Sequence, residues 1–136
     1  MIEIVSNRRT ERAVLVGVCL PGSDRRETEE TMRELARLSD TAGVEVVGQI
    51  VQERAALDPT YFIGGGKVQE VRRMAEETEA DVVIFDDDLS PAQVRNVERV
   101  VEAKVLDRSA LILDIFAAHA RSAEARTQVE LAQLEY

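Results

Sequence analysis

Four short apolar runs alternate with segments of helical pattern along this chain, and that alternation limits the possible folds more than any other feature. The runs span residues 13–20, 44–51, 81–85 and 104–107, and the first and third are almost continuously apolar. Continuously apolar strands are typical of parallel sheets that are covered on both faces. The repeated strand–helix order therefore predicts an α/β fold: a small four-stranded, mainly parallel sheet flanked by helices. We expect a doubly wound strand order such as 2-1-3-4.

Helices are predicted over residues 24–41, 67–78 and 90–103. Asp24 is suited to the N-cap of the first helix, and Gly43 ends it. The third helix has the clearest start, because Ser90 suits the N-cap and Pro91 the first helical position. Gln93 then supplies the reciprocal bond of a capping box.

The C-terminal segment, residues 109–136, contains neither Gly nor Pro and predicts one uninterrupted helix. At about 1.5 Å per residue this helix is roughly 42 Å long, whereas four strands at about 4.8 Å each make a far narrower sheet. We therefore expect residues 1–120 to form the α/β domain and residues 121–136 to begin a helical linker. Because no capping signal ends the helix, we expect the natural polypeptide to continue.

The formal net charge is −9, and the segment 76–88 is rich in carboxylates without a single basic residue. A surface of this sign repels nucleic acid and anionic lipid, so any contact with RNA must be local. The single cysteine, Cys19, excludes an internal disulfide and is typical of a reducing, cytoplasmic environment. No apolar run approaches the roughly 20 residues that span a bilayer, so we expect no membrane insertion.

The stretch YFIGGGKVQEV, residues 61–71, sets three glycines and a lysine ahead of a predicted helix, as a phosphate-binding loop would. The P-loop pattern fails, because it requires glycine where Tyr61 stands and a hydroxyl residue where Val68 stands. A helix start at Gly65, Gly66 and Lys67 would still favour an anion through its free N–H groups, so nucleotide binding remains open. The glycines would alternatively supply only the backbone freedom of a turn into the helix.

A third interpretation concerns the whole loop, residues 52–67. This loop carries Tyr61 and Phe62, and its two acids are balanced by Arg54 and Lys67. Rings that stack on bases, cations that meet phosphates and glycines that allow close approach are typical of contacts with RNA. The alternative is that the two rings fold back onto the edge of the sheet.

Several longer motifs follow one another from Glu11 onward: ERAVLVGV, YFIGGGKVQEV, VIFDDDLSPAQVRNVE and KVLDRSALILDIFAAHARSAEARTQVELAQLEY. In this order and spacing they resemble the N-terminal part of the HflX family of ribosome-associated GTPases. The chain departs from the family pattern at Gly65, where Thr or Ser is usual, and at His119, where Arg is common.

The resemblance implies a domain that binds the large ribosomal subunit and helps to split or rescue ribosomes, with a loop near rRNA of the peptidyl-transferase region. The residues implied in this contact are Arg54, Tyr61, Phe62, Ile63, Gly64, Gly65, Gly66 and Lys67. GTP and magnesium would bind to a downstream G domain, a further expected partner, and this segment itself would hold no cofactor. Some family members are reported to bind or hydrolyse ATP through this part, so an adenine-nucleotide site at Gly65, Gly66 and Lys67 is the alternative.

Asp86, Asp87 and Asp88 follow the third predicted strand, at the edge where α/β sheets place ligands. Carboxylates there suit magnesium, but they also favour the positive N-terminus of the following helix, which we take as their main role. His119 stands on a helix without a second His or a nearby Cys, so it is a poor metal or catalytic candidate. We expect neither a metal site nor a catalytic residue in this segment.

Overall fold

The computed structural model describes the backbone of residues 10–134 and the side chains of residues 10–121. Its elements are, in chain order, β1 (Arg12–Cys19), α2 (Arg25–Thr41), β2 (Glu45–Glu53), α3 (Gly65–Thr78), β3 (Val82–Phe85), α4 (Pro91–Val101), β4 (Lys104–Leu106) and α5 (Arg108–Leu134). The strands pair in parallel in the order β2-β1-β3-β4. The predicted α/β class, the parallel sheet and the expected strand order are confirmed.

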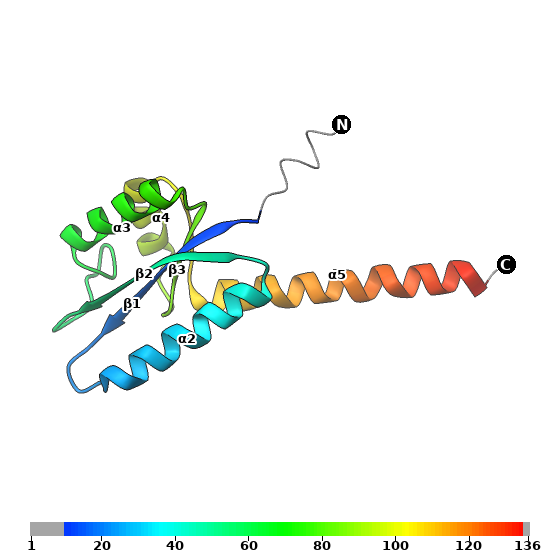
Figure 1. The fold of residues 1–136 in the computed structure, drawn as a ribbon, viewed down its shortest axis with the longest axis horizontal. Helices are drawn as coiled ribbons and strands as arrows, with labels where there is room; N and C mark the ends of the chain where they lie inside the picture. The colour runs from blue at the N-terminus through cyan, green and yellow to red at the C-terminus, as the bar shows by residue number, and fades with distance from the viewer. Residues whose placement is uncertain (1–9, 135–136) are drawn as a thin grey trace.

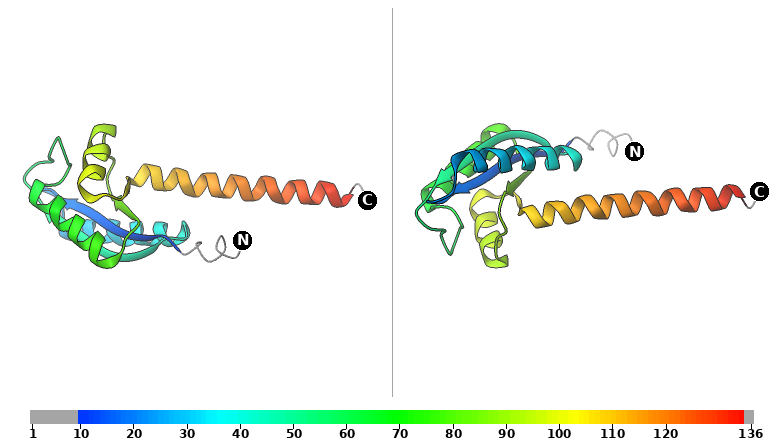
Figure 2. Two further views of the ribbon diagram at one scale, coloured as in Figure 1. Left: turned by 90° about the horizontal axis from the view of Figure 1, so that it is seen from above. Right: turned by 90° about the horizontal axis from the view of Figure 1, so that it is seen from below.

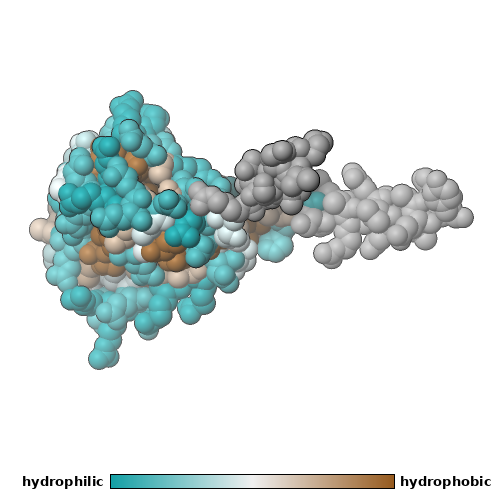
Figure 3. All heavy atoms as spheres, turned by 45° about the horizontal axis from the view of Figure 1, so that its top comes forward, coloured by the Kyte–Doolittle hydropathy of each residue, from teal (hydrophilic) through white to brown (hydrophobic). Residues whose placement is uncertain are grey.

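Helices α2 and α5 cover one face of the sheet, and α3 and α4 cover the other (Figure 1). Side chains of β1 and β3 alternate between two apolar cores: Val14 and Phe85 lie with α3 and α4, whereas Leu15 and Ile84 lie with α2 and α5. All residues of β3 are buried, and this two-sided burial explains its continuously apolar sequence. On the face drawn in Figure 3, hydrophilic residues cover most of the described surface, and apolar residues show between them.

Helix α5 leaves the sheet and continues as a long projection (Figure 2). Leu111 is buried against the sheet, but Leu113 and Phe116 are each 66% exposed, so one face of the helix is open to solvent soon after its start. It runs without a break through residue 121, where the start of the linker stays a prediction. Within the described residues, no helix has both the length and the apolar character needed to cross a membrane.

The helix starts follow side chains that were recognisable in the sequence. The Ser90 hydroxyl accepts the N–H of Gln93 at 3.1 Å, and the Gln93 side chain accepts the N–H of Ser90 at 2.9 Å, which completes the predicted capping box. Asp24 caps α2 by accepting the N–H of Arg26 at 3.0 Å. The start of α3 was predicted too late, because the helix already includes Gly65.

Candidate functional site

The loop between β2 and α3 is closed on itself at residues 58–62. The N–H of Phe62 donates to the carbonyl of Asp58 at 2.9 Å, and the N–H of Asp58 donates to the carbonyl of Phe62 at 3.1 Å. Inside this closure the Asp58 carboxylate accepts the N–H groups of Thr60 at 2.8 Å and Tyr61 at 2.9 Å. These bonds, first that of Tyr61 and then that of Thr60, hold the pKa of Asp58 below its usual range. The ionised carboxylate therefore stabilises the turn at neutral pH.

Side chains from α4 and β2 fasten this loop from two sides. Nε2 of Gln93 donates to the carbonyl of Asp58 at 3.0 Å, and Nδ2 of Asn96 donates to the carbonyl of Thr60 at 3.1 Å. At the other end of the loop, the Gln52 side chain accepts the N–H of Gly64 at 3.0 Å. The loop backbone is therefore anchored both to the strand that precedes it and to a helix that follows much later in the chain.

Phe62 and Ile63, which the family resemblance implies in rRNA contact, point into the core. Phe62 is 5% exposed, and Ile63 is fully buried. The ring of Phe62 packs edge-to-face against Phe85 of β3, with 6.1 Å between the ring centroids. Its φ of 68° is a left-handed conformation that bulky residues rarely adopt. Of the two alternatives for the rings, the inward one describes Phe62, so its expected contact with RNA is not available in this conformation, whereas Tyr61 is partly exposed.

The glycine run forms the N-terminus of α3. Gly64 is the N-cap, and it has no side chain with which to cap the helix. A Cβ at Gly64 would lie 2.5 Å from Nη1 of Arg54, so any larger residue would displace that guanidinium. Gly65 and Gly66 have open space where a side chain would project, and both are exposed. Nothing in the packing of the domain therefore requires glycine at these last two positions.

Lys67 and Arg54 are the cations of the loop. Nζ of Lys67 lies 2.8 Å from Oε2 of Glu70, and the lysine side chain is 24% exposed. Arg54 donates through Nε to a loop carbonyl at 2.8 Å and makes no ion pair within the described residues. A hollow of about 560 Å³ lies beside Lys67, between the carboxyl ends of β1 and β2 and the start of α2. Because neither Gly65 nor Gly66 lines it, the residues of the alternative nucleotide site do not converge on this cavity.

The three aspartates after β3 are not assembled into a metal site. Asp86 pairs with Arg108 at the start of α5, and Asp88 accepts the hydroxyl of Ser109 at 2.6 Å. Desolvation, followed by repulsion from Asp86 and Asp88, raises the pKa of Asp87, although its side chain keeps contact with water. In the part of the chain that the structure describes, no three His, Cys, Asp or Glu side chains are placed to hold a metal ion. Asp86 and Asp88 instead fasten the β3–α4 loop to α5.

Residues 55–60 form the exposed tip of the loop, and they were predicted as part of the loop without any of them being named as a contact residue. Leu57 is 44% exposed, and Pro59 and Thr60 are exposed as well. Asn96, which holds this tip, was also missed. Its spacing of three residues from Gln93 places both amides on one face of α4, and this is the signal that could have revealed it.

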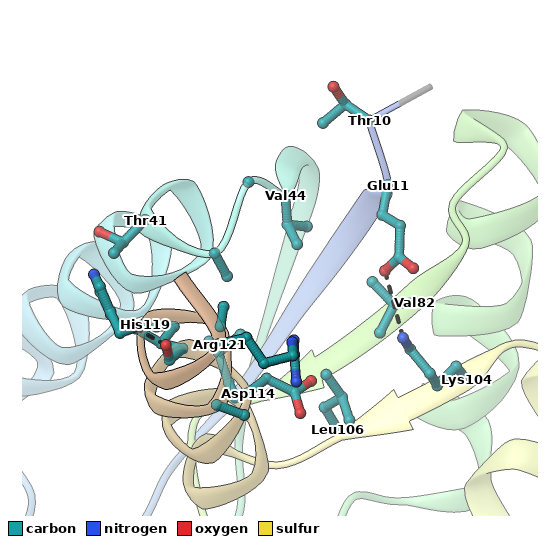
Figure 4. Close-up of a pocket in the computed structure, with 16 residues that line it drawn as sticks. Thr10, Glu11, Thr41, Val44, Val82, Lys104, Leu106, Asp114, His119 and Arg121 are labelled. Atoms are coloured by element: carbon teal, nitrogen blue, oxygen red, sulfur yellow. Dashed lines mark hydrogen bonds and ion pairs between the residues drawn. The ribbon is translucent and has the colours of Figure 1, made fainter. Parts of the chain in front are cut away.

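A hollow of about 770 Å³ lies at the opposite edge of the sheet, between α5 and the end of α2 (Figure 4). Glu11 and Lys104, joined at 3.5 Å, lie on its rim. Nδ1 of His119 lies 3.1 Å from the carbonyl of Ile115 in its own helix, and no other His or Cys lines this hollow. The hollow therefore offers no metal-binding or catalytic set among its lining residues.

The fold and the loop define a small α/β domain that presents an anchored loop at the carboxyl edge of a parallel sheet and extends into a long helix. A family described as GTP-binding GTPase N-terminal matches this chain over residues 29–117. The chain belongs to this family, and it corresponds to the N-terminal domain of HflX GTPases, as its motifs indicated.

Curated relatives and a solved structure agree with this assignment. GTPase HflX from Alkalihalophilus pseudofirmus is 46% identical over 132 residues, which cover 97% of this chain and 31% of that protein. GTPase HflX from Escherichia coli K12 is 46% identical over 126 residues, with coverages of 93% and 29%. A GTP-binding protein from the hyperthermophilic archaeon Sulfolobus solfataricus, solved with GDP, has a TM-score of 0.62 at 27% identity, with coverages of 93% and 36%. The chain spans about a third of the length of these proteins.

Proposed function

We propose that this chain is the ribosome-contacting domain of an HflX-type GTPase, which binds the large ribosomal subunit through its β2–α3 loop. The whole protein helps to split or rescue ribosomes in the cytoplasm, and the loop meets rRNA near the peptidyl-transferase region. GTP and magnesium belong to a G domain elsewhere in the protein, which is the second partner of this domain. Residues 1–120 make the ribosome contact, and residues 121–136 begin the linker.

The observation that carries this proposal is that the anchored loop holds Arg54, a cation without an ion pair among the described residues, in an acidic domain. The chain has a net charge of −9, so phosphate groups are attracted only where cations are locally available. Arg54 has no ion pair within the described residues, and the carboxylate of Asp58 is taken up by backbone N–H groups. The loop therefore offers a backbone of fixed shape together with the guanidinium of Arg54, a combination typical of phosphate contacts that position a protein on RNA.

Charge removal at the loop tests the proposal. Arg54→Gln combined with Lys67→Gln removes two positive charges from the loop, and Arg33→Gln combined with Arg37→Gln removes two from the exposed face of α2 as a matched control. Binding of each variant to purified large subunits is measured by co-sedimentation over a range of salt concentrations. We expect the loop pair to weaken binding and to lower the salt slope by roughly one to two, and the control pair to have little effect. Equal effects of the two pairs would show that net charge alone matters and would refute the loop contact.

Adenine-nucleotide binding at Gly65, Gly66 and Lys67 is the second candidate function. The exposed, uncapped start of α3 favours it, because its N–H groups are free to meet a phosphate. Isothermal titration calorimetry of this chain with ATP and magnesium tests it directly. The absence of heat at millimolar ATP would eliminate this candidate.

A further inference from the structure

We propose that Arg108 and Asp86 form a clasp that fixes the direction of α5, and that the helix turns when the charge of Asp86 is lost from the clasp. The clasp is closed in this structure, where Arg108 pairs with Asp86 of the β3–α4 loop and with Glu34 of α2. Figure 2 shows that α5 then continues far beyond the sheet. A change in a loop at the carboxyl edge of the sheet is thereby converted into a movement of the far end of the helix.

The start of α5 is bonded to the β3–α4 loop at several points. Asp107 is the single residue between β4 and α5. Its Oδ1 accepts the N–H of Ala110 at 2.9 Å and so caps the helix, while its Oδ2 accepts the N–H of Leu89 at 3.1 Å. The hydroxyl of Ser109 donates to Asp88 at 2.6 Å. The position of the loop and the direction of the helix therefore depend on each other.

Within the side chains that the structure describes, apolar packing holds only the first turns of α5. Leu111 is buried and Ile115 is partly buried in the core that α5 shares with α2, whereas residues 116–121 are all exposed. At about 1.5 Å per residue, the backbone from residue 111 to residue 134 is about 35 Å long, so a tilt of about 10° at its start moves its far end by about 6 Å. The direction of the helix therefore depends on a few contacts near its start.

The clasp has a buried half and an exposed half, and this difference allows it to open. The side chain of Asp86 is 10% exposed and that of Glu34 is 56% exposed, while Arg108 between them is 23% exposed. A buried charge that loses its partner is strongly destabilising, but Arg108 keeps Glu34 when Asp86 leaves the pair. The open state is therefore accessible, and in it the start of α5 is held to α2 alone.

Coupling of this kind acts in both directions. If loss of the Asp86 charge favours another direction of α5, then a partner that holds α5 in that direction weakens the pair of Arg108 with Asp86 by the same free energy. Such a partner would also loosen the β3–α4 loop, which is bonded to the same helix start. The clasp thus links the carboxyl edge of the sheet to whatever contacts the projecting helix.

Spin labels on α3 and α5 report the direction of the helix. Gln69→Cys and Ala120→Cys place the labels at exposed positions on elements that cover opposite faces of the sheet, and Cys19→Ser removes the native thiol. Double electron–electron resonance then gives the distribution of distances between the two labels. The helix is about 14 Å long between residues 111 and 120, so a tilt of about 10–15° moves the label by about 2–4 Å.

Two variants open the clasp, and a third is the matched control. Asp86→Asn removes the charge, and Asp86→Asn combined with Arg108→Gln removes the whole pair without leaving a buried charge alone. Arg72→Gln is the control, because Arg72 also joins two carboxylates, Glu76 at 3.0 Å and Glu102 at 3.6 Å, and none of the three lies on α5.

We expect both variants at Asp86 to shift or broaden the distance distribution by about 2–4 Å, and Arg72→Gln to leave it unchanged. The double variant should add nothing to Asp86→Asn, because the clasp is already open in the single variant. An unchanged distribution in both variants at Asp86, or an equal change in Arg72→Gln, overturns the clasp.

Hydrogen exchange of the Leu111 amide separates turning of the helix from fraying of its start. This amide donates to the carbonyl of Asp107 at 3.1 Å, in the first turn of α5. We expect its exchange rate to be the same in all variants, because the cap at Asp107 stays in place. A changed distance distribution together with faster exchange at Leu111 would mean that the helix unravels, and it would overturn the proposal. Neither measurement depends on ribosome binding, so failure of the clasp leaves the proposed function untouched.

Discussion

Replacing Phe62 by alanine and by glycine tests whether its left-handed backbone is strained. Both changes remove a ring that is 5% exposed and packs on Phe85, and such a loss lowers the free energy of unfolding by about 3–5 kcal/mol. At a φ of 68° a residue with a Cβ is destabilised by about 1–2 kcal/mol, whereas glycine is not. The extra freedom of glycine in the unfolded chain costs about 0.5–1 kcal/mol. We therefore expect Phe62→Gly to be more stable than Phe62→Ala by roughly 0.5–1 kcal/mol.

Ile63 provides the control, because it is fully buried but is not among the residues with positive φ. There we expect the usual order, with Ile63→Ala more stable than Ile63→Gly by about 0.5–1 kcal/mol. Urea unfolding is followed by far-UV circular dichroism, since the chain has no tryptophan. Trimethylamine oxide at a fixed concentration keeps all four variants folded at zero urea. If alanine is the more stable choice at both positions, the strain assigned to Phe62 does not exist.

The same urea assay checks three further changes. Ser90→Ala removes the hydroxyl half of the capping box and should destabilise the domain by about 1 kcal/mol; no change would mean that the cap is replaced by water. The pKa of Asp87 is raised in the folded state, so stability is lost as pH rises through that pKa. Asp87→Asn should therefore raise the urea midpoint at pH 7 but not near pH 3, about a unit below the ordinary aspartate pKa. The pKa of Asp58 is lowered, so its contribution is present above the unfolded pKa and is lost as pH falls through the folded one. Asp58→Asn should lower the midpoint at pH 7, and its effect should shrink as pH falls below the ordinary aspartate pKa of about 3.9; a pH-independent effect at either aspartate would contradict these assignments.

The fold could be predicted from the sequence because a strand that is buried on both faces must be apolar along most of its length. Strand β3 is buried at every residue, and its neighbour β1 is buried over most of its length, so both had to be apolar on both faces. The capping box of α4 was equally predictable, because Ser90 and Gln93 satisfy each other without help from the rest of the chain. Features that depend on one element alone are the ones that the sequence reveals.

The direction of the loop side chains was not predictable in this way. Local sterics disfavour a positive φ at phenylalanine, so the sequence around Phe62 left open whether its ring turns inward or outward. The turn is fixed by partners far away in the chain: the ring of Phe85 and the amides of Gln93 and Asn96. Tertiary contacts of this kind override local preference, and they left the candidate site less well predicted than the fold that carries it.

The place of the loop on an edge strand explains how an acidic domain could meet RNA at all. Since the strands are parallel, the loops after β2 and β3 leave the sheet at the same edge, and β1 separates them. Two strand spacings of about 4.8 Å put them roughly 10 Å apart, which is close to the Debye length of about 8 Å at physiological salt. The negative charge of Asp86, Asp87 and Asp88 is therefore largely screened at the loop that carries Arg54. The same charge still opposes any approach in which a polyanion first meets the loop after β3. If the domain meets RNA as proposed, this charge distribution favours the orientation in which the tip of the β2–α3 loop arrives first.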